Sequence, residues 1–201
     1  RSLVGSEMCI RDSMKADAYG HGLRVCAEYA APYVDWFAAA TLEEALAVRA
    51  AAPHTPILIF GGLLDPEIVQ AAQYDLTINV FSLQYASHVQ ALLQPLGLQI
   101  DVHIKVDTGM SRLGFLVREG HFDTGVESIA AACALPGLEA EGIFTHFAVS
   151  DEDDRDSEAY TRAQFDVFTR VLDALAAGGR TFAIRNCANS GALARYPEMY
   201  L

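Results

Sequence analysis

Residues 57–80, ILIFGGLLDPEIVQAAQYDLTINV, contain a complete strand–helix–strand unit. The runs at 57–60 and 76–80 are short and continuously apolar, which is typical of parallel strands that are buried on both faces. Between them, Asp65 and Pro66 provide the cap and the first turn of a helix. A chain that repeats this unit builds a parallel sheet covered by helices, so the stretch predicts an α/β fold.

The same alternation continues on both sides of this stretch. Further strand-like runs lie at 36–40, 100–106, 142–147 and 182–187. Thr41 and Glu44 form a predicted capping box for a helix at 42–51, and the longest predicted helix, at 158–177, ends at Gly178. Six such units in series indicate either a doubly wound sheet or a (β/α)8 barrel. Since no GxGxxG motif opens a helix, we expect a TIM-type barrel.

Composition restricts the class of protein. The 201 residues carry 14 Lys and Arg against 26 Asp and Glu, a net charge of −12, which speaks against nucleic acid as a partner. No apolar run is long enough to cross a membrane, so we expect no membrane partner. The four cysteines lack metal-binding or CxxC spacing, which indicates reduced thiols in a cytoplasmic protein without a metal site.

The sequence at both ends of the chain indicates truncation. Residues 1–13, RSLVGSEMCIRDS, resemble neither a signal peptide nor their neighbours, and we interpret them as a non-native tail similar to translated sequencing adapter. Residues 197–201 stop where an apolar run begins. We therefore expect residues 14–201 to form an incomplete (β/α)8 barrel that lacks its first strand and its last unit.

Polar residues follow several of the predicted strands, where barrel enzymes place their working residues. Lys15 precedes a turn with Gly20 and Gly22; it is either a lysine whose lowered pKa permits a Schiff base or an ordinary surface lysine. Lys105 shares a strand face with His103 and needs a partner in the interior, for which Asp101 and Asp107 are candidates.

Two further strands end in polar groups. Thr145 and His146 lie at the end of the predicted strand at 142–147, although a lone histidine there is more often structural. Asn189 and Ser190 open a short helix whose amides and hydroxyl could hold a phosphate, or simply cap it. We interpret residues 151–154, four consecutive acids, as a solvated loop, and Cys187 as a small buried residue.

Four motifs in order, KADAYGHG at 15–22, KVDTGMSRLG at 105–114, THFA at 145–148 and ANS at 188–190, resemble alanine racemases. The resemblance extends over residues 14–201 and implies the N-terminal barrel of an enzyme that uses pyridoxal 5′-phosphate. It also implies interconversion of L- and D-alanine for peptidoglycan supply, and a homodimer for the full-length protein.

The resemblance assigns a role to individual residues. Lys15 matches the lysine that binds the cofactor covalently and acts as base on one face of the substrate. Tyr19, assisted by Ser190, matches the contact to the cofactor phosphate. Arg112 matches the arginine near the cofactor's phenolic oxygen and the substrate carboxylate. The remaining matches are His146 beside the pyridine ring, Asn189 in the same wall, and Lys105, a lysine that is often carbamylated in this family and then orients Arg112.

Two residues of the family pattern lie outside this chain. The opposing base is a tyrosine from a C-terminal β-domain of the partner subunit, and an arginine faces the pyridine nitrogen. We therefore expect little or no racemase activity from the polypeptide as given. A broad-specificity amino-acid racemase and a non-catalytic pyridoxal-phosphate-binding barrel remain as alternatives; a related decarboxylase is disfavoured by the KADAYGHG motif.

Overall fold

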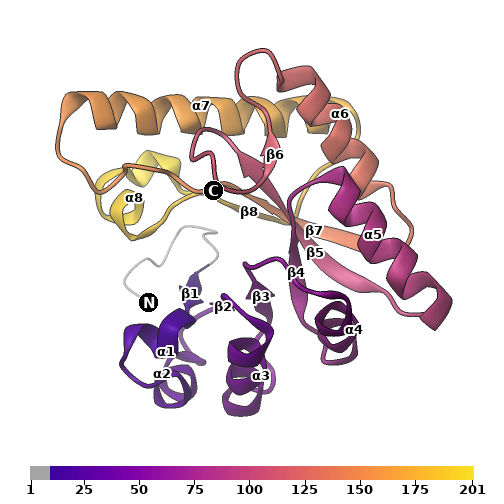
Figure 1. Cartoon of the computed structure of the whole chain (residues 1–201). Helices are drawn as coiled ribbons and strands as arrows, with labels where there is room; N and C mark the ends of the chain where they lie inside the picture. The colour runs from indigo at the N-terminus through magenta and orange to yellow at the C-terminus, as the bar shows by residue number, and fades with distance from the viewer. Residues whose placement is uncertain (1–9) are drawn as a thin grey trace. The chain divides into compact units, whose positions relative to one another are not determined.

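A computed structural model describes residues 10–201 of the chain. Strands and helices alternate along it (Figure 1). The strands are β1 (Arg11–Ser13), β2 (Trp36–Ala39), β3 (Ile57–Ile59), β4 (Thr77–Val80), β5 (Ile100–Asp107), β6 (Phe115–Leu116), β7 (Leu138–Phe144) and β8 (Ile184–Asn186). The helices are α1 (Lys15–Tyr19), α2 (Leu23–Ala30), α3 (Leu42–Ala51), α4 (Asp65–Gln73), α5 (Leu83–Leu93), α6 (Phe122–Cys133), α7 (Arg155–Ala177) and α8 (Ser190–Arg195), with 3₁₀ turns η1 (Gln94–Leu96) and η2 (Pro197–Met199).

The strands follow one another in the sheet in nearly the order of the sequence. That order is β1-β2-β3-β4-β5-β7-β8, and the short strand β6 pairs with β5. The pairings β1–β2, β2–β3, β3–β4 and β7–β8 are all parallel. A (β/α)8 barrel has eight parallel strands in sequential order. The fold is therefore α/β with an incomplete barrel, which confirms the predicted class.

The chain divides into two compact units, each described by itself. The first contains residues 10–79, His88–His103 and Pro136–Glu139 among those described, and the second contains Val80–Ser87, Ile104–Leu135 and Ala140–Leu201. In the first unit, α2 packs against α3, and α3 packs against β2 and β3. In the second, α6 packs against α7 and β6. Strand β5 contributes residues to both units.

The strands that the sequence predicts best are those in which every residue is buried. Every residue of β2, β3 and β4 is buried, as expected for parallel strands covered on both faces. The predicted helix starts are also confirmed, since α3 begins after Thr41 and α4 begins at Asp65 with Pro66 in its first turn. Strand β7 instead starts four residues and ends three residues earlier than predicted, so that Thr145 and His146 follow the strand directly.

The polar segment before Lys15 forms a strand of three residues, where the sequence predicts that the first strand is lacking. Strand β1 pairs with β2, with Arg11 opposite Trp36 and Ser13 opposite Ala38. The Arg11 guanidinium lies 5.2 Å from the centre of the Phe60 ring and its Nη1 lies 3.3 Å from His103 Nδ1. A polar sequence is accommodated because parallel pairing uses the backbone and Arg11 finds partners. Residues 1–9 of the predicted tail lie outside the described residues.

Candidate functional site

The turn after β1 carries Lys15 and Tyr19 and has an unusual backbone. Residues 16–19 all have left-handed conformations, with φ values of 52°, 55°, 54° and 56°. Each L-residue in this region costs about 1–2 kcal/mol, and four in succession are rare. Helix α1 is therefore a single left-handed turn. Backbone strain of this kind concentrates at functional sites.

Two carboxylates hold this turn through backbone hydrogen bonds. The Ala16 amide donates to Glu44 Oε1 at 2.8 Å, and the Leu23 amide donates to Asp17 Oδ1 at 2.7 Å. Glu44 also accepts from the Ala40 amide at 2.8 Å. The predicted capping box of α3 is therefore formed on one side only. Thr41 accepts from the Glu44 amide, while the Glu44 carboxylate is directed to the turn that carries Lys15.

The functional side chains of the turn are accessible. Tyr19 is 62% exposed, Lys15 is also exposed, and Lys15 Nζ lies 5.4 Å from the centre of the Tyr19 ring. Asp17 and Glu44 bind backbone amides, and Lys15 forms no ion pair with any residue between 10 and 201. The structure therefore brings an amine and a phenol together on an exposed turn.

In the second unit, the loop after β5 carries Arg112. Asp107, itself buried, accepts hydrogen bonds at Oδ1 from the amides of Gly109 and Ser111, both at 3.0 Å. Arg112 follows directly and is exposed; within the described chain it forms no hydrogen bond or ion pair. The loop thus combines a fixed backbone with an arginine available for an anionic group.

Lys105 lies inside the fold, as its strand position predicts. It is 7% exposed, and its Nζ lies 4.8 Å from the centre of the Phe144 ring. A cation placed over an aromatic face recovers part of the cost of burying its charge. The predicted carbamylation of Lys105 stays a prediction.

The segment after β7 is joined to the loop after β5 by buried hydroxyls. Thr145 Oγ1 lies 2.8 Å from Thr108 Oγ1 and donates to the Val106 carbonyl at 3.0 Å. Thr108 in turn accepts from Gln164 of helix α7 at 3.2 Å. His146 follows Thr145 and is half-buried. We call Gln164, Thr108 and Thr145 the buried chain; Thr108 and Thr145 lie in motifs recognised in the sequence, whereas Gln164 does not.

The Asn189 side chain forms hydrogen bonds with neighbouring parts of the fold. Its Oδ1 accepts from the Ala192 amide at 2.9 Å, which caps helix α8, and from Ser150 Oγ at 2.6 Å. Ser150 is fully buried and was not recognised as a site residue. Ser190, the first residue of α8, is exposed. The cofactor-binding roles predicted for Asn189 and Ser190 therefore stay predictions, with Ser190 the more accessible.

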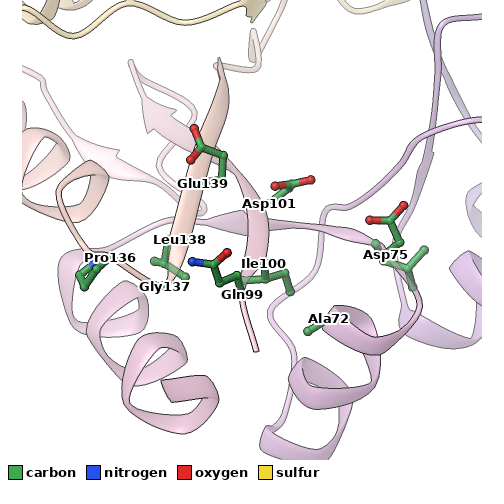
Figure 2. Close-up of a pocket in the computed structure, with 10 residues that line it drawn as sticks. Ala72, Asp75, Gln99, Ile100, Asp101, Pro136, Gly137, Leu138 and Glu139 are labelled. Carbon is green, nitrogen blue, oxygen red and sulfur yellow. The ribbon is translucent and has the colours of Figure 1, made fainter. Parts of the chain in front are cut away.

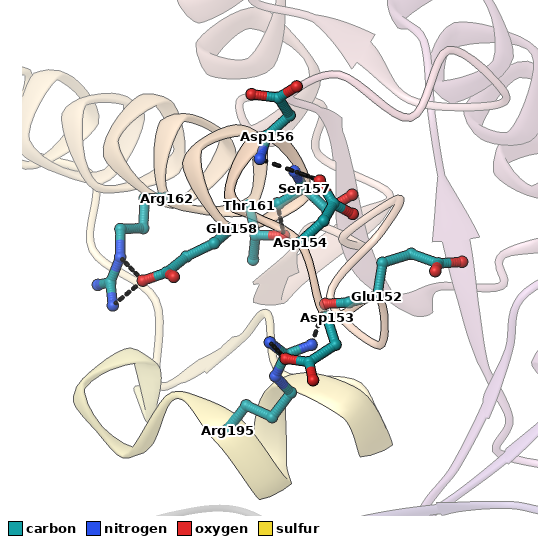
Figure 3. Close-up of polar contacts among 9 residues, drawn as sticks. All are labelled: Glu152, Asp153, Asp154, Asp156, Ser157, Glu158, Thr161, Arg162 and Arg195. Atoms are coloured by element: carbon teal, nitrogen blue, oxygen red, sulfur yellow. Dashed lines mark hydrogen bonds and ion pairs between the residues drawn. The ribbon is translucent and has the colours of Figure 1, made fainter.

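One arginine, Arg195, holds the acidic loop before α7 (Figure 3). The Arg195 guanidinium donates to the Glu152 carbonyl and to Asp153 Oδ1. Asp154 caps α7 by accepting from the amides of Asp156 and Ser157, and the hydrogen bonds with Ser157 lower the pKa of this carboxyl. The predicted solvated loop is confirmed, since residues 151–154 are all exposed.

A second arginine joins α7 to the end of the chain. Arg162 pairs with Glu158 at 3.0 Å on its own helix and with Glu198 of η2 at 2.7 Å. Hydrogen bonds with Glu198 and Glu158 raise the pKa of Arg162. These exposed pairs orient the segment that follows α8 and contribute little to stability.

A cavity of about 260 Å³ in the first unit contains none of the predicted site residues (Figure 2). It lies where β5 and β7 begin, at Ile100 and Leu138, whereas the predicted residues follow the strands. Its carboxylates are Asp75, Asp101 and Glu139. Residues 10–201 contain no group of three or more acidic, histidine or cysteine side chains placed to hold a metal ion. None of their helices is long and apolar enough to cross a membrane.

The fold defines an incomplete α/β barrel whose first turn exposes a lysine, and comparison with known proteins gives the family. The family model described as "Alanine racemase, N-terminal domain" matches residues 1–201. The chain belongs to this family. An alanine racemase of Desulforamulus reducens is 42% identical over 205 residues, which cover 100% of this chain and 53% of the relative. The chain thus spans about half the length of the curated relatives it matches.

Solved structures show the same relationship. An alanine racemase of Clostridium difficile 630 aligns with a TM-score of 0.91 and 32% identity, over 100% of this chain and 54% of that one. A histidine racemase of Leuconostoc mesenteroides aligns with a TM-score of 0.81 and 26% identity, over 96% of this chain and 50% of that one.

Proposed function

We propose that this chain supplies the pyridoxal-phosphate-binding part of an enzyme that interconverts L- and D-alanine. The observation that carries the proposal is the left-handed turn after β1, which presents Lys15 without an ion-pair partner among the described residues. Membership in the alanine racemase family supports the reaction and the substrate. An accessible primary amine is what covalent attachment of an aldehyde cofactor requires.

The chemistry of the donor set fits this cofactor. Lys15 offers a primary amine for its aldehyde, and the exposed hydroxyls of Tyr19 and Ser190 can donate to its phosphate. Arg112 offers a guanidinium for a carboxylate or a phenolic oxygen. His146 is half-buried, which suits a group that packs beside a ring.

In the proposed mechanism each of these residues has one task. When bound, pyridoxal 5′-phosphate makes the Cα proton of an attached amino acid acidic by accepting electron density into its ring. The Lys15 amine removes or returns that proton on one face of the substrate. Arg112 binds the substrate carboxylate, and His146 orients the ring. We further propose that carbamylated Lys105 carries negative charge and orients Arg112.

Inversion at Cα requires a second base on the opposite face. The resemblance places this base, a tyrosine, in the half of the relatives that lies beyond these 201 residues. We therefore propose that the chain tested by itself does not racemise alanine, and that the whole protein is a cytoplasmic homodimer that supplies D-alanine for peptidoglycan. We also propose that residues 1–13 are a non-native tail, whose last three residues take the place of the first strand by pairing with β2.

Exchange of the alanine Cα proton with D₂O tests this proposal. We expect the purified chain with pyridoxal 5′-phosphate to exchange the proton of one enantiomer without inversion, at a rate above that of the free cofactor. Lys15→Arg keeps the charge but cannot serve as the base at neutral pH, so exchange should fall to the free-cofactor rate. Exchange that survives in Lys15→Arg would contradict the role of Lys15. Cofactor binding without exchange would favour the non-catalytic barrel.

The similarity to a histidine racemase supports a second candidate, an amino-acid racemase of broader specificity. The same exchange measurement with both enantiomers of histidine and of serine distinguishes the two. A rate for alanine at least about tenfold above the others supports an alanine enzyme, and equal rates support broad specificity.

A further inference from the structure

Gln164 of helix α7 contacts both loops of the second unit that carry predicted site residues. Its Nε2 lies 3.2 Å from Thr108 Oγ1 and 3.3 Å from the His146 carbonyl, and its Oε1 accepts from the Ala148 amide at 2.9 Å. The residue is 1% exposed. This buried primary amide forms hydrogen bonds with three groups from two loops, so it does more than fill space in the core.

The partners of Gln164 fix the direction of every hydrogen bond in the buried chain. The Ala148 amide can only donate and the His146 carbonyl can only accept, so the orientation of the Gln164 amide is determined. Gln164 therefore donates to Thr108. Since the Thr145 hydroxyl donates to the Val106 carbonyl, the Thr108 hydroxyl donates to Thr145. The hydrogen bonds of the buried chain therefore all donate in one direction, from α7 towards the backbone of β5.

A second residue of α7 reinforces this contact one helical turn earlier. The Tyr160 hydroxyl donates to the Gly109 carbonyl at 2.7 Å. A Cβ at Gly109 would lie 2.7 Å from Tyr160 Oη and 3.2 Å from Gln164 Cγ, so the loop and the helix are in direct contact. Helix α7 thus holds the loop two residues before Ser111 and three before Arg112.

We propose that Gln164 is a positioning residue, which holds His146 and the Arg112 loop in the arrangement that binds the cofactor through directed hydrogen bonds. The proposal rests on the proposed function for its consequence, and on the contacts of Gln164 for its geometry. Gln164 does not itself touch substrate or cofactor in this account. Its role is to supply two donors and one acceptor that no apolar side chain of the same size can supply.

Two substitutions in the 201-residue chain separate this role from packing. Gln164→Glu keeps the shape and the acceptor for Ala148, but an ionised carboxylate cannot donate to Thr108 or His146. Gln164→Met keeps the volume and removes all three hydrogen bonds. Gln84→Glu, at an exposed position of α5, is the control for added charge. The readouts are exchange of the Ala148 amide and the Kd for pyridoxal 5′-phosphate from pH 5 to 8, each relative to the wild-type chain at the same pH.

We expect Gln164→Glu to weaken cofactor binding about tenfold at pH 8, since an unsatisfied buried group is costly. Binding should recover as the pH falls, because protonation of a buried carboxyl restores one donor. Gln164→Met should weaken binding at every pH and speed Ala148 exchange at least about tenfold, whereas Gln164→Glu should keep Ala148 protected.

The opposite results overturn the proposal. A merely structural role predicts equal effects of the two variants with no dependence on pH. Unprotected Ala148 in the wild-type chain, or unchanged protection in Gln164→Met, would show that the hydrogen bond does not hold the loop. Failure of the wild-type chain to bind the cofactor would sink the proposed function together with the role of Gln164 in it, while the amide measurement would still decide whether the contact exists.

Discussion

The turn after β1 and the buried chain of the second unit hold predicted site residues by opposite means. The Lys15 turn is exposed and depends on left-handed backbone, with two carboxylates that bind amides. The buried chain lies under the surface and depends on side-chain hydroxyls and one amide. One region presents its functional side chain through strain, and the other through a satisfied polar network.

This difference determines which substitutions each region tolerates. An exposed turn tolerates new atoms but is sensitive to any change in backbone preference. A buried network tolerates neither new atoms nor a lost donor, because no water replaces it. The following expectations use this contrast, in order of decreasing effect.

The largest contrast is in the reactivity of cysteines. Burial raises the pKa of the Cys187 thiol to about 12, whereas Cys26 lies half-buried on α2 next to the Lys15 turn. Because the thiolate is the reactive form, Cys187 should be alkylated at least about a thousandfold more slowly than an ordinary thiol at neutral pH. Peptide mapping after iodoacetamide treatment should find Cys26 labelled and Cys187 labelled only after unfolding. Equal labelling in the folded chain would contradict the contrast.

Gly114→Ala should be the most destabilising glycine substitution in the loop after β5. Gly114 has φ 138°, and an added Cβ would lie 2.7 Å from the Asp107 nitrogen and 3.0 Å from the Lys105 carbonyl oxygen. Backbone atoms cannot move aside as a side chain can, so we expect a loss of about 3 kcal/mol in the free energy of unfolding. Urea unfolding measures it, and a loss of less than about 1 kcal/mol would show that the loop is not tightly packed.

Gly20→Ala tests the same change in the exposed turn. Gly20 has φ 85°, but an added Cβ would meet nothing within 4 Å. Only the conformational cost remains, so we expect a loss of about 1 kcal/mol in the free energy of unfolding. The substitution also serves as the control for Gly114→Ala in the same urea series. A loss as large as that of Gly114→Ala would mean that the turn is packed rather than merely strained.

The smallest effect concerns the cap of the helix that carries Gln164. Hydrogen bonds with Ser157 lower the pKa of Asp154 in the folded state, so its stabilisation is present above the ordinary carboxyl pKa and is lost as the pH falls through the lowered value. Asp154→Asn caps without titrating. The difference in unfolding temperature between wild type and Asp154→Asn should therefore shrink from pH 7 to pH 3. Asp173→Asn, exposed on the same helix, is the control, and a constant difference would contradict the cap's contribution.

The sequence predicts the parts of this molecule that depend on burial and local capping. The apolar runs of β2, β3 and β4 and the starts of α3 and α4 need no distant partner to be recognised. The left-handed turn could not be predicted from Ala16, Asp17 and Ala18, since alanine ordinarily avoids this conformation and aspartate adopts it only as a single residue; Gly20 and Gly22 were the only signal.

Gln164 of the buried chain escaped prediction for a different reason. A glutamine on a helix usually faces water, and its three partners come from segments 16 to 56 residues away in the sequence. One signal was present, because Gln164 falls on the buried stripe that also holds Phe168, Val171 and Leu175. A polar residue on such a stripe must find buried partners, and here they are the loops of the site.

Reductive trapping of the cofactor shows directly whether Lys15 is the residue that binds it. Lys15 and Lys105 are the only lysines of the chain, and only Lys15 is exposed. The purified chain is incubated with pyridoxal 5′-phosphate, reduced with borohydride and mapped by mass spectrometry. We expect one pyridoxyl group on Lys15 and none on Lys105. Absence of label in a folded sample, or label on both lysines, would contradict it.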